Sequence, residues 1–587
     1  ARLPSDGRIL LLEPRRLAAR NVARRLAETL NEPVGKTVGY RMRGESRCGP
    51  ETRLEVVTEG ILTRMLQQDP ELTGVSLVIL DEFHERSLQA DIALALLLDV
   101  QQSLRDDLKI LLMSATLDHQ RLSALLPQAP VIISEGRSYP VERRYISLSA
   151  RLPFPEAVAR EAAQLLSEHL GSMLIFLPGE REILAVKQQL VARLSSDTDV
   201  FPLYGAMSLA DQQQAISPSL PGKRKVVLAT NIAETSLTID GIRLVVDCGL
   251  ERAVRYDNKS GLSLLQTQRI SQASMVQRAG RAGRLEPGIC WHLLSQEQAE
   301  RAAAVSEAEI LNSDLGALRL DVLCWGCREL SQLQWLDLPP ANRQAAEFRQ
   351  LQQLGAVDQR QQLTPLGRQM ATAGTEPRLA AILSAAHHSS SAMATACLLV
   401  AILEDPPRNS SSDLLSLFLR PQAQWVTRAR VLQQRSGLQG GEVDDALLPE
   451  LLVAGFGDQL ARQRDQSGRY LMVKGSGASL ATDDPLARYE WLLVLRLSFG
   501  PQQTEARIRL AMPVDIAELA RQCPDLIEER DDVEWDEEKG ILRVRRQQAI
   551  GALILTSRPG NRPEAPVLHQ AMLRWVRSKG LSVLPWT

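Results

Sequence analysis

The sequence lacks several features that would assign it to a class at once. Its 68 basic and 70 acidic residues leave a formal net charge of only -2, so any claim of nucleic-acid binding must rest on local surfaces. Apolar runs such as Ile92–Leu98 are too short to span a membrane. Low-complexity segments and coiled-coil repeats are not apparent. We therefore expect a soluble globular protein.

Cysteine is scarce and odd in number. Seven cysteines among 587 residues make no disulfide framework, which fits a reducing cytoplasm. The closest pair, Cys324-Trp325-Gly326-Cys327, is a lone CxxC without a second pair or a flanking histidine. We interpret these thiols as buried or incidental rather than as a zinc or redox site. We expect a cytoplasmic protein.

What is present is a chain long enough for several domains, with 44% hydrophobic and 24% charged residues. Its first three hundred residues alternate helical patterns with six short, unalternated apolar runs, as strands buried on both faces require: Ile9–Leu12, Leu77–Leu80, Ile110–Met113, Leu174–Leu177, Val226–Leu228 and Leu244–Val246. Each run ends in a polar or small cluster. Reactive side chains would then lie at the carboxyl ends of parallel strands, where open α/β sheets bind ligands.

Changes in the hydrophobic pattern along the chain suggest how it is divided into domains. A boundary at Tyr139–Arg144 separates two series of strands, so we expect two α/β domains. Beyond about residue 300 the pattern is helical, and from about residue 445 it is mixed. Alternating residues around Glu538-Lys539-Gly540 predict a β-hairpin.

Two carboxylates, Asp81 and Glu82, directly follow the run Leu77–Leu80. In a triphosphatase the first carboxylate of such a pair holds magnesium, and the second orients or deprotonates the attacking water. A helix N-terminus whose acids complement the dipole is the alternative. The pair alone does not decide between the two.

An arginine-rich segment, Gln277–Arg284, lies in the second α/β domain. Arg281 and Arg284 are three residues apart and can share a helical face, offering two guanidinium groups to a triphosphate. A solvated basic face is the alternative. The glycines of this segment argue against it, because they weaken a helix but permit close approach.

With this carboxylate pair and this arginine-rich segment, the chain resembles the DEAH-box helicases of superfamily two. The resemblance rests on motifs that stand in family order: Asp81-Glu82-Phe83-His84, Ser114-Ala115-Thr116, Ala229–Asp240, the arginine-rich segment, Glu13–Arg20 and Thr58-Glu59-Gly60. Phe83 departs from the family's alanine in the manner of an HrpB-like bacterial subgroup, which the whole chain resembles.

The resemblance implies a role for each matching residue at a nucleotide site for ATP or another NTP with Mg²⁺. Asp81 would bind the metal and Glu82 would be the catalytic base. Gln277, Arg281 and Arg284 would surround the γ-phosphate, and His84, Ser114 and Thr116 would couple hydrolysis to domain movement. Asp240 would contact the ribose. Arg25 would stack on the base, but Ile216 stands where the opposing aromatic often lies, so we expect weak base selectivity.

The same motifs imply a nucleic-acid surface. Five arginines between Arg15 and Arg25 crowd the start of one helix, where cations oppose the dipole and phosphates would explain them. The residues expected to bind single-stranded or structured RNA, or DNA, are Arg15, Arg16, Thr58, Thr230, Asn231 and Thr235. The segment Glu251–Ile270, with its turn at Asn258–Gly261, predicts a hairpin that resembles the family's strand-separating wedge.

The fold implied by the resemblance is α/β: tandem RecA-like domains with parallel sheets, followed by winged-helix, ratchet-like helical-bundle and OB-like β regions. We place these at residues 1–138, 139–300, 301–372, 373–445 and 446–587, the last of which would also hold the start of a subgroup-specific C-terminal region. The later motifs are Leu354–Asp358, Leu363–Gly367 and Pro377-Arg378-Leu379. The acidic run Glu528–Glu538 is interpreted as a solvated face.

A glycine-rich phosphate loop of the form GxxxxGK[ST] is missing from the sequence. Gly35-Lys36-Thr37 does not supply it, because Leu30 occupies the position of the first glycine. Both ends look cut, and we expect the loop before Ala1 and little or no hydrolysis by this sequence alone. Two functions remain: a triphosphate-driven helicase, favoured by the carboxylate pair and the arginines, and a non-hydrolysing clamp derived from one.

Overall fold

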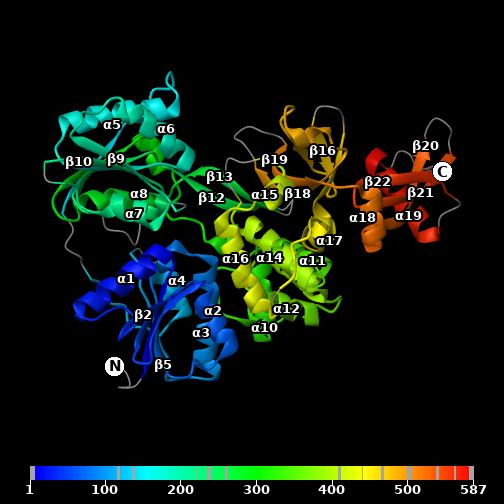
Figure 1. Ribbon diagram of the computed structural model, residues 1–587, viewed down its shortest axis with the longest axis horizontal. Coiled ribbons are helices and arrows are strands. Elements are labelled where there is room, and N and C mark those ends of the chain that lie inside the picture. Colours follow the sequence, from blue (N-terminus) through cyan, green and yellow to red (C-terminus); the bar gives the residue numbers. More distant parts are fainter. Residues whose placement is uncertain are drawn as a thin grey trace. The chain divides into compact units, whose positions relative to one another are not determined.

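The computed structural model describes residues 7–115, 119–134, 139–205, 207–220, 222–234, 239–257, 262–406, 411–438, 440–464, 468–498, 505–536, 541–560 and 564–580. The chain forms two compact units (Figure 1): Ala1–Arg255 with Leu265–Gln344, and Tyr256–Leu264 with Ala345–Thr587. None of the described helices is long and apolar enough to cross a membrane.

The first unit begins with a six-stranded sheet of order β3-β2-β4-β1-β5-β6, parallel except between β2 and β3. Its elements are β1 (Arg8–Glu13), α1 (Arg16–Thr29), β2 (Val38–Met42), β3 (Glu45–Arg47), β4 (Leu54–Thr58), α2 (Ile61–Gln68), β5 (Val75–Leu80), α3 (Leu88–Ser103), β6 (Lys109–Leu112) and α4 (His119–Leu125). The first three predicted strands are therefore confirmed, with Met113 just beyond β6.

A second six-stranded sheet, of order β7-β14-β11-β8-β10-β9, is entirely parallel. Its elements are β7 (Val141–Tyr145), α5 (Phe154–Glu168), β8 (Ser172–Phe176), α6 (Glu180–Val191), β9 (Thr198–Leu203), α7 (Leu209–Ile216), β10 (Arg224–Ala229), β11 (Ile242–Asp247), α8 (Gln272–Gly280), β14 (Gly288–His292) and α9 (Gln296–Glu300). The predicted hairpin is the separate pair β12 (Leu250–Asp257) and β13 (Leu262–Arg269), whose turn lies outside the described residues.

After the second sheet, the chain packs onto the first. This return segment, which we define as residues 308–337, contains the 3-10 turns η4 (Glu309–Leu311) and η5 (Leu330–Gln332) on either side of α10 (Gly316–Trp325). Ile310, Leu318 and Leu330 belong to the same buried cluster as Leu80 and Leu97 of the first sheet and its helix. The return segment is thus part of the core around the first sheet. The five domain boundaries proposed from the sequence stay predictions.

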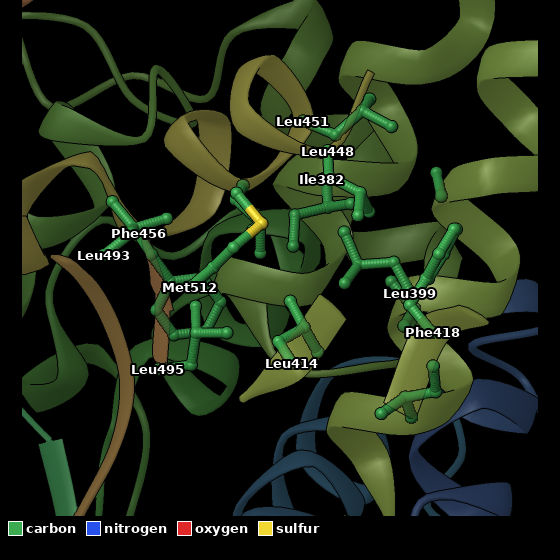
Figure 2. Packing of buried hydrophobic residues seen from close by; sticks show 14 of the residues in the cluster. Ile382, Leu399, Leu414, Phe418, Leu448, Leu451, Phe456, Leu493, Leu495 and Met512 are labelled. Atoms are coloured by element: carbon green, nitrogen blue, oxygen red, sulfur yellow. The ribbon is translucent and has the colours of Figure 1, made fainter. Parts of the chain in front are cut away.

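The second unit combines helices with two β structures. Its helices are α11 (Ala341–Gln353, which begins in the first unit), α12 (Pro365–Ala373), α13 (Pro377–Ala385), α14 (Ser390–Glu404), α15 (Leu414–Leu419), α16 (Ala423–Ser436), α17 (Leu448–Phe456), α18 (Ile516–Gln522) and α19 (Ala565–Lys579). Figure 2 shows helical residues such as Ile382 and Leu451 in one core with barrel residues such as Leu493 and Met512.

The β structures agree with the expected OB-like region and hairpin. Five strands close into a barrel: β15 (Leu460–Gln463), β16 (Arg469–Met472), β17 (Gly477–Ser479), β19 (Ala506–Pro513) and β18 (Trp491–Ser498). A three-stranded sheet follows: β20 (Glu528–Asp536), β21 (Ile541–Ile550) and β22 (Leu553–Pro559). Asp536 pairs with Ile541 in antiparallel register, as the predicted hairpin requires, and its turn lies outside the described residues.

Candidate nucleotide and nucleic-acid site

The box Asp81-Glu82-Phe83-His84 forms a tight turn at the carboxyl end of β5. The Asp81 amide donates to the Leu12 carbonyl (3.1 Å), and the Phe83 amide donates to the Met113 carbonyl (3.0 Å). Phe83 begins the 3-10 turn η1 (Phe83–Glu85), and its ring is buried in the core of the first sheet. This anchor leaves the carboxylates of Asp81 and Glu82 half-buried at the sheet edge.

His84 is the residue of the box that contacts the Ser114-Ala115-Thr116 motif. Its Nδ1 accepts a hydrogen bond from the Ala115 amide (3.3 Å), and its Nε2 lies 3.5 Å from Oε2 of Glu82. Ser114 is half-buried beside it, and Thr116 lies outside the described residues. The imidazole therefore lies between the Glu82 carboxylate and the Ala115 amide.

Glu13 lies beside the box, although the sequence assigned it no role beyond its place in the Glu13–Arg20 motif. It ends β1, the strand next to β5, and is 2% exposed. Burial, followed by the charge of Asp81, raises the pKa of Glu13 to about 8. One of its oxygens, Oε2, has no hydrogen-bond partner among the described residues. The available signal was its place at the carboxyl end of a strand, next to the aspartate of the box.

The carboxyl groups of Glu13, Asp81 and Glu82 fit a divalent cation. Their mutual repulsion favours a positive charge nearby, and so does the buried Oε2 of Glu13, which lacks a hydrogen-bond partner among the described residues. No three Asp, Glu, His or Cys side chains of the described residues are grouped so that they could hold a metal by themselves. Mg²⁺ is commonly held by one or two carboxylates together with phosphate oxygens and water. The arrangement therefore fits magnesium bound with a triphosphate.

The arginine-rich segment forms the end of α8 and the 3-10 turn η3 (Arg281–Gly283). Arg281 donates to the Glu234 carbonyl, and Arg281 and Arg284 line a small cavity in the second α/β domain. A Cβ at Gly283 would lie 2.5 Å from the Tyr139 carbonyl oxygen, so close approach does require this glycine. Gln277 lies half-buried on α8.

Arg284 interacts electrostatically with the box on the first sheet. Desolvation lowers the pKa of Arg284, and the negative charge of Glu82 acts against this shift. The carboxylate expected to be the base and an arginine expected to meet the γ-phosphate are thus close enough to sense each other's charge.

Arg278, inside the same segment, is almost fully buried and was not singled out from the sequence. It donates to Oε2 of Glu234 (2.9 Å), Oδ1 of Asp247 (2.9 Å) and the Leu250 carbonyl (3.2 Å). Its guanidinium carbon lies 4.9 Å from the centre of the Phe176 ring. Arg278 therefore ties together the loop after β10, the end of β11 and the start of β12.

Two predicted nucleic-acid residues, Arg15 and Asn231, are in contact. Arg15 donates to the Asn231 carbonyl (2.8 Å) and to Oε1 of Glu85 (3.2 Å). Arg16 and Asn231 are exposed, Thr230 precedes the 3-10 turn η2 (Asn231–Ala233), and Thr58 is buried at the end of β4. Arg25, on α1, and Asp240, just before β11, are exposed, and Thr235 lies outside the described residues.

Two largely parallel sheets, one with a carboxylate box and the other with an arginine-rich turn, define a nucleotide-driven helicase motor of superfamily two. Family profiles agree: "DEAD/DEAH box helicase" matches residues 2–125, "Helicase conserved C-terminal domain" 157–286, and "Helicase associated domain (HA2), winged-helix" 349–372. A fourth profile, "ATP-dependent RNA helicase HrpB, connector region", matches residues 526–560.

Comparison with individual relatives assigns the chain to one family within this class of helicases. The chain is 58% identical over 582 residues to the ATP-dependent RNA helicase HrpB of Escherichia coli, covering 99% of this chain and 72% of that protein. A crystal structure of the Escherichia coli DEAH/RHA helicase HrpB matches with a TM-score of 0.92 and 56% identity, over 99% of this chain and 73% of that one. The ATP-dependent RNA helicase HrpA of Escherichia coli is 37% identical over 384 residues, 64% of this chain and 29% of that protein. The chain belongs to the HrpB family of DEAH-box helicases.

Proposed function

We propose that this protein is an ATP-dependent helicase that couples hydrolysis of Mg²⁺-NTP between its two RecA-like domains to movement along a single strand of RNA, or of DNA. The observation that carries the proposal is the placement of the carboxylate box at the end of β5 in one sheet and of the arginine-rich turn after α8 in the domain of the other sheet. A base on one domain and a charge-stabilising arginine on the other make hydrolysis depend on domain closure.

In this mechanism each side chain has a separate task. Asp81 would hold magnesium, which supplies neutralising charge for the phosphates. Glu82 would accept a proton from the attacking water, and His84 would keep that carboxylate in register with Ser114. Arg281 and Arg284, with Gln277, would stabilise charge on the γ-phosphoryl group. Loss of such an arginine typically costs ~10³-fold in rate.

The nucleic-acid side would rest on contacts to the backbone of the strand. Arg15, Arg16, Thr58 and Asn231 would bind backbone phosphates and sugars, which predicts binding that is insensitive to sequence and weakened by salt. RNA is favoured because the relatives named above are RNA helicases. Seven free cysteines favour a reducing compartment, and we place the protein in the cytoplasm.

The test is Glu82→Gln in a protein that carries a GxxxxGK[ST] loop before residue 1. We expect RNA-stimulated hydrolysis to fall ~10² to 10⁴-fold, as for loss of a general base, while RNA affinity by fluorescence anisotropy is retained. Glu51→Gln, an exposed carboxylate in the same domain, is the matched control and should leave both unchanged. Unchanged turnover in Glu82→Gln would remove this residue from the role of base. A non-hydrolysing clamp would instead bind RNA without any measurable turnover.

A further inference from the structure

The turn that carries Glu82 and His84 is flanked by two backbone conformations that non-glycine residues rarely adopt. Glu82 has φ 51° and Arg86 has φ 49°, both left-handed. Each such residue costs ~1–3 kcal/mol and persists only where its surroundings hold it. Contacts that fix Arg86 therefore fix one end of the turn.

The Arg86 guanidinium is held by two carboxylates, one of them distant in sequence. Its Nε and Nη2 donate to the two oxygens of Asp91 (3.0 Å each), at the start of α3. Its Nη2 also donates to Oδ2 of Asp337 (2.7 Å), whose Oδ1 accepts from Arg121 (2.5 Å). The Arg86, Asp91 and Asp337 side chains are 16%, 5% and 18% exposed, so solvent screens these charge-assisted bonds only weakly.

The backbone on either side of Ser87 is held from the same remote stretch. The Glu309 amide donates to the Arg86 carbonyl (3.0 Å), and Oε2 of Glu309 accepts from the Leu88 amide (2.9 Å). Glu309 and Asp337 lie near the two ends of the return segment, whose apolar residues share the core with Phe83. The return segment thus forms hydrogen bonds with both the Arg86 side chain and the backbone at the end of the turn.

We propose that Arg86 is a positioning residue for hydrolysis, and that Asp337 and Glu309 make the return segment a strut that aims Glu82 and His84. The return segment follows the second sheet in sequence, so it is a route by which events outside the first sheet reach the carboxylate box. The inference deepens the proposed function and rests on it. A purely structural ion pair would stabilise the fold without affecting the turn selectively.

The first test compares Asp337→Asn with Asp107→Asn by amide hydrogen exchange. Asp107 is the control, because it too accepts two arginine hydrogen bonds, both from Arg105 (2.6 and 2.7 Å), in the same domain, before β6. We expect exchange at the amides of Glu85, Arg86 and Leu88 to rise about tenfold in Asp337→Asn, as local opening becomes easier. Asp107→Asn should leave these amides unchanged. Equal exchange in the two variants overturns the proposal.

The second test uses RNA-stimulated hydrolysis by a chain with a phosphate loop. Asp337→Asn should lower kcat about tenfold with little change in KM for nucleotide, and Asp107→Asn should lower neither. Arg86→Lys keeps the charge but loses the fork, and its double variant with Asp337→Asn should cost less than the sum of the two single losses. If the losses of the two single variants are strictly additive in the double variant, the proposed role of the return segment as a strut is contradicted. If Asp337→Asn does not fold, Arg86→Lys supplies both readouts. If the chain with the phosphate loop and no other change hydrolyses no nucleotide, the proposed function fails, while the exchange comparison still tests the strut.

Discussion

Replacing Arg278 by methionine should destabilise the second α/β domain more than any surface change. The substitution removes the cation that neutralises Glu234 and Asp247, whose side chains are 11% and 0% exposed. Removing one partner of a buried ion pair typically costs ~3–5 kcal/mol. For a domain of this size each kcal/mol shifts the melting temperature by ~2–4 °C. We therefore expect a fall of roughly 10 °C in calorimetry at pH 8.

The pH dependence of this loss identifies its cause. Burial would raise the pKa of Asp247, but Arg278, followed by His292, holds it below its ordinary value. Without Arg278 the effect of burial remains, so the folded-state pKa should exceed the unfolded value of ~3.9. A carboxyl group with a raised pKa destabilises the fold as pH rises through that pKa. The deficit of Arg278→Met should hence be smaller at pH 5 than at pH 8.

The matched control for this experiment is Arg143→Met. Arg143 donates to Nε2 of His292 (3.1 Å) at the edge of the same network but touches neither carboxylate. We expect it to cost under about 1 kcal/mol, the net contribution of one hydrogen bond. The reasoning is refuted if Arg278→Met loses no more than Arg143→Met, or if its deficit is the same at pH 5 and pH 8.

Two further substitutions test burial and close packing. Burial raises the pKa of Asp321, which accepts from Gln67 (2.7 Å), from 3.8 to about 6, so its contribution to stability is lost as pH rises from about 4 to 6. Asp321→Asn should therefore gain about 3 kcal/mol over the unchanged protein at pH 8 in urea unfolding and nothing at pH 4; an equal gain at both pH values contradicts this. A Cβ at Gly367 would lie 2.1 Å from the Ala356 carbonyl oxygen, so Gly367→Ala should cost ~1–3 kcal/mol, whereas Gly280→Ala, where a Cβ meets open space, should be neutral or stabilising. Equal melting temperatures for these two variants would show that the contact at Gly367 relaxes without cost.

Local patterns were sufficient to predict the strands that carry the site. The runs at Ile9–Leu12 and Leu244–Val246 have buried residues on both faces, and in Leu77–Leu80 one face is buried and the other half-buried. Such strands are readable because the apolar signal is continuous. The two carboxylates at the end of β5 followed from the same logic. The arginine-rich turn was found because its residues are consecutive.

What the sequence did not reveal depends on contacts between distant residues. The partners of Arg278 are 44 and 31 residues away, and those of Arg86 include Asp337, 251 residues away. No periodicity encodes such pairs. The place of Glu13 beside the box was missed for a related reason. Its neighbour Asp81 follows an adjacent strand and lies 68 residues later in the chain. The individual roles of the site residues stay predictions.

The return segment has a consequence for how the protein is synthesised. The hydrophobic core around the first sheet includes Ile310 and Leu330, but 195 residues separate Leu112 from Ala308. At ~5–20 residues per second, a ribosome needs roughly 10–40 s to span that gap. During this interval the nascent first domain exposes apolar surface on α3 that nothing yet covers. Chaperone dependence should therefore be greatest before residue 308 emerges, and nascent chains that stop in the second domain should aggregate more readily than those that extend past residue 337.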